Sequence, residues 1–211
     1  MMKTVIFGAG GQAGTAAAAE ASSRGHHVTA LRRPGADVTD PRAVATAAFG
    51  HDAAVVAVAP SGGDPVAFYR AAADGIATGL AEAGVTRLVW VSIASLLPDA
   101  SGVAPVDAAG FPARYRPFSL GHRAALERFR GSALRWTAVS PAGDFDRDLS
   151  PHGGYILTNV AAPAARIGHP DLARAAIDLA ERPDAHPGEH VGVHLPSSHT
   201  SATAREWRKD R

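Results

Sequence analysis

A glycine-rich turn near the N-terminus is the first candidate for chemistry. The segment "VIFGAGGQAG" places an apolar run before the glycines and a helix-forming run after them. Glycine lets the backbone turn tightly and approach a phosphate closely, and the free N–H groups at the start of the next helix favour anions. Two spacings overlap in the segment, G-x-G-x-x-G/A and G-x-x-G-x-x-G. Both predict a dinucleotide cradle made of Gly8, Gly10, Gly11, Gln12, Ala13 and Gly14.

The end of the second apolar run indicates which dinucleotide to expect. An acid at this place would hydrogen-bond the ribose 2′-hydroxyl of NAD, whereas arginine pairs with the 2′-phosphate of NADP. The segment "TALRRPG" carries Arg32 and Arg33 there and has no acid. The sequence therefore predicts NADP(H) in preference to NAD(H). The alternative, a solvated basic turn, stays open for at least one of the two arginines.

The order of apolar runs and helical stretches predicts the fold that positions these residues. Short apolar runs alternate with alanine-rich helical segments, which is typical of βαβ units around a parallel sheet. We expect an α/β, Rossmann-like, doubly wound fold with a mostly parallel sheet and flanking helices, in one domain over residues 1–211. Only six residues, Arg32 to Asp37, separate the second strand from Val38, so the third strand region is expected to be shortened. The expected strands are 4–7, 27–31, 53–59, 87–92, 136–140 and 190–195, and the expected helices are 12–23, 41–49, 65–83, 119–130 and 171–182.

Two long irregular segments follow predicted strands. In an open α/β sheet, the loops after the carboxyl ends of strands line the ligand crevice. Segments of about 93–118 and 142–169 are therefore expected to face the substrate, although irregular surface excursions are the simpler alternative. The basic C-terminal tail, 197–211, is interpreted as a solvated segment without a function of its own.

Composition excludes several classes of function. The chain has no cysteine, which rules out disulfides and thiolate chemistry. Its formal net charge of +1 gives no reason to expect nucleic acid or an anionic membrane as a partner. No apolar run approaches the ~18 residues of a membrane span. We expect a cytoplasmic protein, monomer or homodimer, that acts on a small molecule.

Taken together, several segments resemble a known family. They are "VIFGAGGQAG", "RGHHVTALRR", "ADVTDP", "AGVTRLVWVSIAS", "FPARYRPFSLGHRAALERFR" and "LRWTAVSPAG". The chain resembles the atypical short-chain dehydrogenase/reductases, and more narrowly the NmrA-like, NAD(P)H-binding oxidoreductases. The resemblance becomes looser after Asp144. For the matching positions it implies adenine contacts at Asp37 and Val38, ribose contacts at Ala59, Pro60 and Ser61, an active-site serine at Ser92, and nicotinamide contacts at Pro141 and Ala142.

The catalytic signature departs from the wider superfamily. That superfamily uses Tyr-x-x-x-Lys, in which the lysine helps the tyrosine to protonate the substrate oxygen. The only lysines here are Lys3 and Lys209, and neither fits that place. Counting back from Trp136, the tyrosine position falls on Phe118 and the lysine position on His122. Standard carbonyl reduction driven by a tyrosine is therefore not expected.

Other side chains are candidates for the missing roles. His122 could hydrogen-bond the nicotinamide ribose or donate a proton, or it could be a polar helix residue without catalytic duty. Tyr115 could reach the substrate, or it could pack a loop. The candidate catalytic residues are thus Ser92, His122 and Tyr115, and the candidate substrate-pocket residues are Ser61, Phe118, Phe145 and Tyr155.

Two clusters suggest metal binding but are better explained otherwise. His186, His190 and His194 recur every four residues, but Pro187 and Gly188 prevent a helix there. A surface strand, with both later histidines on one face, explains the pattern better. The acidic segment 144–148 is interpreted as a solvated loop over the pocket. No metal site is predicted.

These observations predict an NADPH-dependent reductase that transfers hydride to a small conjugated or aromatic acceptor of the quinone, flavin or enone type. Such acceptors can take their proton from water, so the protein needs mainly to orient the reactants. Two alternatives stay open. One is a non-catalytic regulator that senses NADP(H), and the other is a non-redox isomerase, lyase or cyclase on the same fold.

Overall fold

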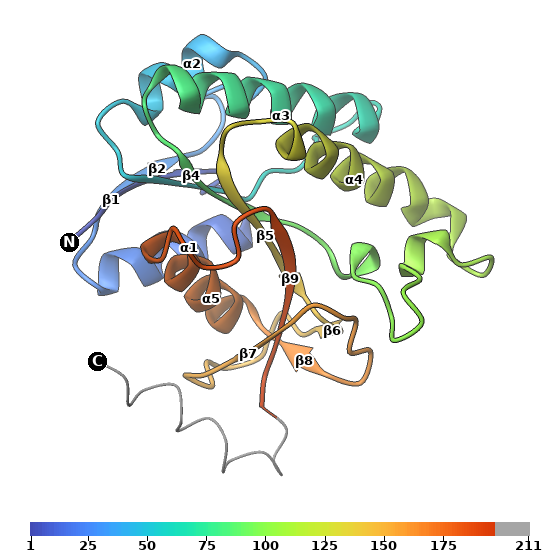
Figure 1. Ribbon diagram of the computed structural model, residues 1–211. Helices are drawn as coiled ribbons and strands as arrows, with labels where there is room; N and C mark the ends of the chain where they lie inside the picture. Colours follow the sequence, from blue (N-terminus) through green and yellow to red (C-terminus); the bar gives the residue numbers. More distant parts are fainter. Residues whose placement is uncertain (197–211) are drawn as a thin grey trace.

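A single central sheet organises the protein. The structure, a computed structural model, describes residues 1–196. Seven strands form the sheet in the spatial order β2-β1-β3-β4-β5-β9-β7 (Figure 1). Two further strands, β6 and β8, pair separately. The strands are β1 (Lys3–Phe7), β2 (His27–Leu31), β3 (Ala53–Val56), β4 (Arg87–Val91), β5 (Arg135–Pro141), β6 (Asp144–Phe145), β7 (Ile156–Thr158), β8 (Arg166–Ile167) and β9 (Glu189–His194).

Strand direction explains where ligands can bind. The pairings from β2 through to β9 are all parallel, and only β7 runs antiparallel, at one edge. The strand order reverses at β1, which has β2 on one side and β3 on the other. In such sheets the ligand crevice opens beyond the carboxyl ends of the strands at this reversal. The glycine loop, which follows β1, lies at that point.

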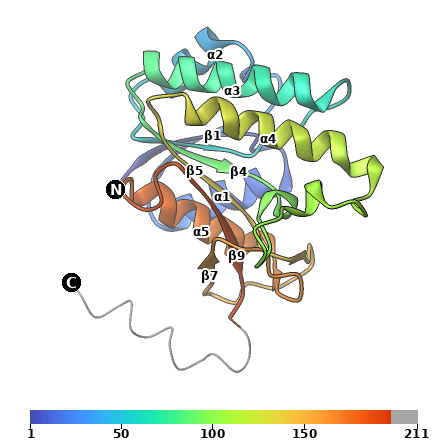
Figure 2. The same ribbon diagram turned by 45° about the vertical axis from the view of Figure 1, so that its right-hand side comes forward.

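The helices cover both faces of the sheet. They are α1 (Gln12–Ser23), α2 (Pro41–Ala48), α3 (Pro65–Glu82), α4 (Arg116–Arg130) and α5 (His169–Glu181). Figures 1 and 2 show α2, α3 and α4 on one face and α1 and α5 on the other. Tyr69, Trp90 and Phe129 fill the core under α3 and α4. Ile6, Val55 and Ile177 lie in the core under α1 and α5.

Helices α1 and α5 run parallel and are tied together at their ends. Arg24, just after α1, pairs with Asp178 at 2.6 Å and Glu181 at 3.1 Å, both in the last turns of α5. Glu20 of α1 holds the same guanidinium at 2.6 Å. Because the carboxyl ends of the two helices meet, their amino ends lie together at the opposite edge of the sheet.

The doubly wound fold predicted from the sequence is confirmed, including the shortened region. Within residues 1–196 no strand lies between β2 and α2, so β2 is an edge strand. Helix α4 begins at Arg116, earlier than predicted, because Pro117 suits a first helical turn. The histidine-bearing strand is not a surface strand, which corrects that prediction: β9 lies inside the sheet, between β5 and β7.

The segment 93–118 is held in place and does not run freely over the surface. It contains three short 3-10 helices, η1 (Ala94–Leu96), η2 (Pro105–Asp107) and η3 (Ala113–Tyr115). Arg116 donates to the carbonyl of Val106, and Arg123 forms two hydrogen bonds with Asp107. These contacts fasten the loop to the first half of α4.

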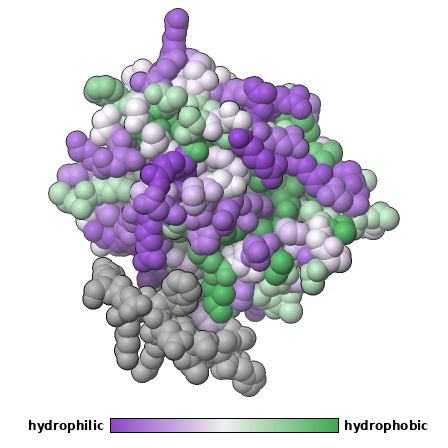
Figure 3. Space-filling model, in the orientation of Figure 1, coloured by the Kyte–Doolittle hydropathy of each residue, from purple (hydrophilic) through white to green (hydrophobic). Residues whose placement is uncertain are grey.

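The helices and the surface of residues 1–196 bear on membrane contact. No helix among residues 1–196 is both long enough and apolar enough to cross a bilayer. Hydrophilic residues cover most of the face in Figure 3, and hydrophobic residues gather in its lower middle. The predicted tail, 197–211, lies outside the described residues.

Glycine permits the close packing of α3 against the start of α2. A Cβ atom on Gly79 would lie 2.5 Å from the Pro41 carbonyl oxygen and 2.6 Å from Val44 Cβ. We therefore expect Gly79→Ala to lower the free energy of unfolding by about 1–3 kcal/mol, a typical cost of overpacking. Thermal denaturation followed by circular dichroism measures this loss. The control is Gly110→Ala, since a Cβ there meets nothing within 4 Å. Equal melting temperatures for the two variants would contradict the packing argument.

Candidate functional site

The glycine loop has the shape of an anion cradle. Gly8 adopts a φ of +88°, and a Cβ on it would lie 2.1 Å from the Ala57 carbonyl oxygen. A Cβ on Gly14 would lie 2.2 Å from the Gly8 carbonyl oxygen. These two glycines are needed by the protein itself, one for the turn and one for packing α1 against the loop. At Gly11, by contrast, a Cβ would meet only the Gly8 oxygen, at 3.6 Å.

The exposed part of the loop fits a pyrophosphate. Gly10, Gly11 and Gln12 are exposed, and the first intrahelical bond of α1 runs from Thr15 N to Gly11 O. The backbone N–H groups of residues 12–14 therefore have no acceptor within the helix. The first turn of α1 carries no acid. Free N–H groups, an uncapped helix start and an open glycine fit the G-x-x-G-x-x-G spacing and a bound diphosphate.

The two arginines lie at the neighbouring edge, beside the glycine loop. The Cβ of Arg32 is 3.2 Å from the position of a Cβ on Gly10, so its stem borders the loop. Arg33 donates to Ser61 Oγ at 2.9 Å, which joins the segments that follow β2 and β3. Both arginine side chains are exposed. Ala59 and Pro60, the other predicted ribose contacts, directly precede Ser61 in the segment after β3.

The predicted adenine-side residues are Asp37 and Val38. Asp37 Oδ1 accepts hydrogen bonds from the backbone N–H and the hydroxyl of Thr39, at 2.9 and 2.7 Å. These two bonds lower the pKa of Asp37 below its ordinary value of 3.8. The Val38 side chain is buried in the core under α3. Only the backbone of Val38 is thus available at this edge.

Ser92 lies at the carboxyl end of β4 but is closed off. Its N–H donates to the Val139 carbonyl at 2.7 Å, which places it beside Ser140 of the next strand. The side chain is 4% exposed, and its Oγ has no hydrogen-bond partner. A buried hydroxyl without a partner carries a desolvation cost of about 1–3 kcal/mol. The structure thus places Ser92 at the predicted strand end, with its hydroxyl facing into protein.

Phe118 and His122 lie in an aromatic cluster of the core. The His122 ring is 4.1 Å from Tyr69, 4.9 Å from Phe118 and 6.4 Å from Trp90, measured between centroids. His122 is 3% exposed, and its Nδ1 has no hydrogen-bond partner. Burial, and to a smaller extent nearby His190, lowers the pKa of His122 to about 3. The imidazole is therefore neutral near pH 7, and the structure does not favour it as a proton donor.

His190 is a polar residue of this region that the sequence prediction missed. It lies on β9, and its Nε2 is 3.0 Å from Ser140 Oγ. Burial, followed by the charge of Arg130, lowers the pKa of His190 to about 4. The alternation of His190 with Val191 and Val193 was visible in the sequence. This alternation does not reveal which face of the sheet α4 covers. His190 lies on the covered face, near His122 and Arg130 of α4.

The remaining candidates are dispersed. The Tyr115 side chain is 53% exposed and lies under the Arg114 guanidinium, 4.7 Å from its ring centroid. The Tyr155 hydroxyl donates to Asp178 of α5 at 2.6 Å, on the face opposite to His122. Ala142 is 1% exposed, since its N–H donates to Val193 and its carbonyl accepts from Ala162. Phe145 remains partly exposed and packs edge-on against His169.

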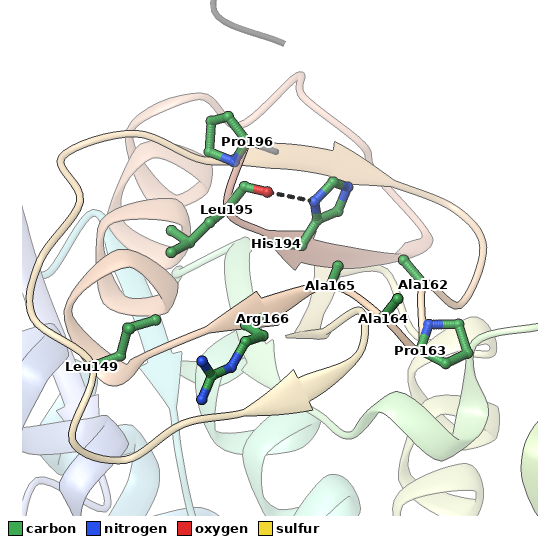
Figure 4. Close-up of a pocket in the computed structure, with 9 residues that line it drawn as sticks. All are labelled: Leu149, Ala162, Pro163, Ala164, Ala165, Arg166, His194, Leu195 and Pro196. Carbon is green, nitrogen blue, oxygen red and sulfur yellow. Dashed lines mark hydrogen bonds between the residues drawn. The ribbon is translucent and has the colours of Figure 1, made fainter. Parts of the chain in front are cut away.

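A cavity of about 590 Å³ lies on the outer side of the β6–β8 pair (Figure 4). Arg166 on β8 lines it, whereas Ile167 is buried in the core under α1 and α5 and the partly exposed Phe145 packs against that core. Arg166 also pairs with Asp146 at 2.5 Å and Asp144 at 3.5 Å. The cavity is therefore separated from the glycine loop by a strand pair. Within residues 1–196 no group of three possible metal ligands comes together.

Comparison with known proteins agrees with this geometry. The sequence profile of a family described as NAD(P)H-binding matches residues 35–183. The chain belongs to this family. The family match supports a nicotinamide dinucleotide as its cofactor. The family is consistent with the resemblance to atypical short-chain dehydrogenase/reductases.

Individual relatives span almost the whole chain. The uncharacterized protein YwnB of Bacillus subtilis (strain 168) is 29% identical, over 91% of this chain and 98% of its own length. A crystal structure from Burkholderia pseudomallei, of a protein provisionally named an exported protein, is 31% identical with a TM-score of 0.83, over 92% of this chain and 100% of that one. A Streptococcus pneumoniae protein provisionally named an NADH-flavin reductase is 27% identical with a TM-score of 0.81, over 93% of this chain and 100% of that one.

Burial of two neutral imidazoles makes stability depend on pH. In the unfolded chain a histidine takes up a proton as the pH falls below about 6.5, whereas folded His122 and His190 resist until about 3 and 4. Stability should therefore fall as the pH drops from 7 to 5, with each residue contributing up to about 1.4 kcal/mol per pH unit. Urea denaturation at several pH values measures how steeply the free energy of unfolding falls between pH 7 and 5. His122→Phe should make this fall about half as steep. An equally steep fall in the variant would show that burial of His122 is not its cause.

Proposed function

We propose that the protein is an NADPH-dependent reductase whose acceptor is a small conjugated or aromatic molecule of the quinone, flavin or enone type. The observation that carries the proposal is the packing of Phe118 and the burial of His122, at the positions where the resemblance places the usual Tyr–Lys pair. Neither side chain can protonate a ketone at neutral pH, because Phe118 has no proton to give and His122 is neutral and closed off. An acceptor whose reduced form is stabilised by conjugation needs less help of this kind.

The chain's own residues then mainly bind and orient. Bound NADPH would supply the hydride. The N–H groups at the start of α1 would hold its pyrophosphate, and Gly11 would leave space for it. The strand ends at Ser92 and Pro141 would form the floor beneath the nicotinamide. Holding two reactants in a fixed relation accounts for much of the catalysis available to such a site.

Relatives support the general class of reaction. The Streptococcus pneumoniae protein, 27% identical, carries the provisional name NADH-flavin reductase. Its name concerns an oxidoreductase with a flavin acceptor, which is one of the three acceptor types proposed here. The match spans 93% of this chain, so the strand ends and loops that would form the site lie inside it.

A preference for NADPH over NADH follows from the charges beside the glycine loop. Arg32 and Arg33 are exposed at the end of β2, where no acid competes with them. Arg32 borders Gly10 directly, while Arg33 is engaged with Ser61. We therefore assign the main contact with the 2′-phosphate to Arg32 and a supporting contact to Arg33.

A second candidate is a regulator that senses NADP(H) without turnover. The burial of Ser92 Oγ and His122 Nδ1, neither of which has a hydrogen-bond partner among residues 1–196, favours it. This candidate shares the cofactor site with the reductase and differs only in the absence of an acceptor.

NADPH oxidation separates the two candidates. Purified protein should lower absorbance at 340 nm when menadione, riboflavin or a simple enone is added, and the rate should require both nucleotide and acceptor. Tight NADPH binding without oxidation by any acceptor in the panel would favour the sensor. Turnover that continues when the nucleotide is omitted would reject both.

Arginine substitution tests the 2′-phosphate assignment. Arg32→Ala should weaken NADPH binding about 10- to 100-fold, the value of hydrogen bonds to a charged group worth about 1.5–3 kcal/mol, and leave NADH nearly unchanged. Fluorescence titration with both nucleotides gives the ratio. Arg182→Ala, another exposed arginine, just after α5, is the matched control. Equal losses for NADPH and NADH would reject the assignment.

A further inference from the structure

Phe145 and His169 form an aromatic pair outside the cluster that buries His122. Their ring centroids are 4.5 Å apart and the planes cross at 88°, a close edge-to-face contact. Both side chains are partly exposed. Phe145 belongs to β6, directly after the end of β5, and His169 is the first residue of α5.

This pair lies at the same edge of the sheet as the glycine loop. Because α1 and α5 run parallel, the start of α5 at His169 and the start of α1 at Gln12 lie at the same end. Phe145 packs on the same hydrophobic cluster as Ala9 of the glycine loop and Val91 at the end of β4. The pair therefore lies at the edge of the sheet that also carries the dinucleotide cradle and the carboxyl end of β5.

His169 differs from the other histidines near this edge. His122 and His190 are packed under α4, and burial keeps both neutral. The His169 imidazole is partly exposed, and its ring forms no hydrogen bond with residues 1–196. His194 faces the cavity on the other side of the β6–β8 pair, where its Nδ1 contacts the Leu195 carbonyl oxygen at 2.8 Å.

We propose that Phe145 and His169 form the acceptor subsite, in which Phe145 packs against a flat conjugated ring and His169 donates a proton to its oxygen. The inference rests on the proposed reductase function. The acceptor gains a hydride from NADPH and a proton from the His169 imidazolium, so the products are NADP⁺ and the reduced acceptor. His169 then recovers its proton from water. In this proposal His169 takes the role of proton donor that the tyrosine has in the wider superfamily.

The charges around His169 set the direction of its pH dependence. Partial burial, and then the positive charge of Arg147, lower the pKa of His169 below its ordinary value of 6.5. Asp146 on the facing segment is paired with Arg166. Asp171 on its own helix accepts from the N–H groups of His152 and Gly153. The protonated form therefore exists at acid pH, and proton donation declines as the pH rises toward neutrality.

The first experiment is a pH profile of menadione reduction by NADPH. For the wild type, kcat should rise as the pH falls below 6.5. His169→Gln should lose this rise and turn over about 100-fold more slowly at the acid end, the lower range for a general acid. The matched control, His194→Gln, should keep the wild-type profile. Circular dichroism and NADPH titration establish that each variant folds and binds nucleotide.

The second experiment does not depend on turnover. Proton NMR of the complex with NADP⁺ should show the His169 ring signal shifting when menadione is added, while the His194 signal stays in place. Phe145→Leu keeps an apolar side chain and should weaken the menadione titration several-fold. This variant also covers the case in which His169→Gln fails to fold.

The outcomes separate the two proposals. A wild type that binds NADPH but reduces no acceptor rejects the reductase function. The subsite is then judged by the NMR titration alone. It is rejected if menadione does not shift the His169 ring signal and Phe145→Leu binds menadione as tightly as the wild type. If the wild type reduces menadione and His169→Gln keeps the acid rise at an unchanged rate, the reductase stands and the role of His169 is overturned.

Discussion

The close approach of three backbone segments at Gly8 is the constraint on which the site depends. The turn after β1 passes so near to β3 that no side chain fits at Gly8, and α1 starts so near to the turn that none fits at Gly14. This packing fixes the start of α1 over the strand reversal between β1 and β3. The N–H groups, the open position at Gly11 and the stem of Arg32 then converge without any dedicated ligand-binding loop. Helix–strand packing alone brings these N–H groups together. The glycine loop itself therefore needs no charged side chain to attract a phosphate.

A second feature of the fold is the packing of Phe118 and His122 into the core under α3 and α4. Where the wider superfamily keeps a polar catalytic pair, Phe118 and His122 pack with Tyr69 and Trp90 under α3 and α4. Aromatic packing of this kind stabilises the helix pair, and it also removes the imidazole from solvent. The same face of α4 can serve core packing or proton transfer. In this structure it serves core packing.

The sequence was informative where chain-local patterns decide the structure. Alternating apolar and alanine-rich runs predicted the sheet and its five main helices, and the six residues after Leu31 predicted the shortened region that leaves β2 at the edge. It was less informative where distant segments meet. The contacts of His190 with Ser140 and of Tyr155 with Asp178 span 50 and 23 positions. The short strands β6, β7 and β8 were not predicted, because two- or three-residue strands have no periodicity of their own to detect.

The ion pairs between α1 and α5 have a mechanical consequence. Arg24 clamps the far ends of two parallel helices, and Tyr155 adds the segment after β6 to the same carboxylate, Asp178. The dinucleotide cradle begins one of these helices, and His169 begins the other. The cradle and the proposed acceptor subsite therefore lie at the starts of two helices that are joined at their far ends, and helix packing sets the distance between them. The segment after β4 is fastened separately, to α4, through Arg116 and Arg123.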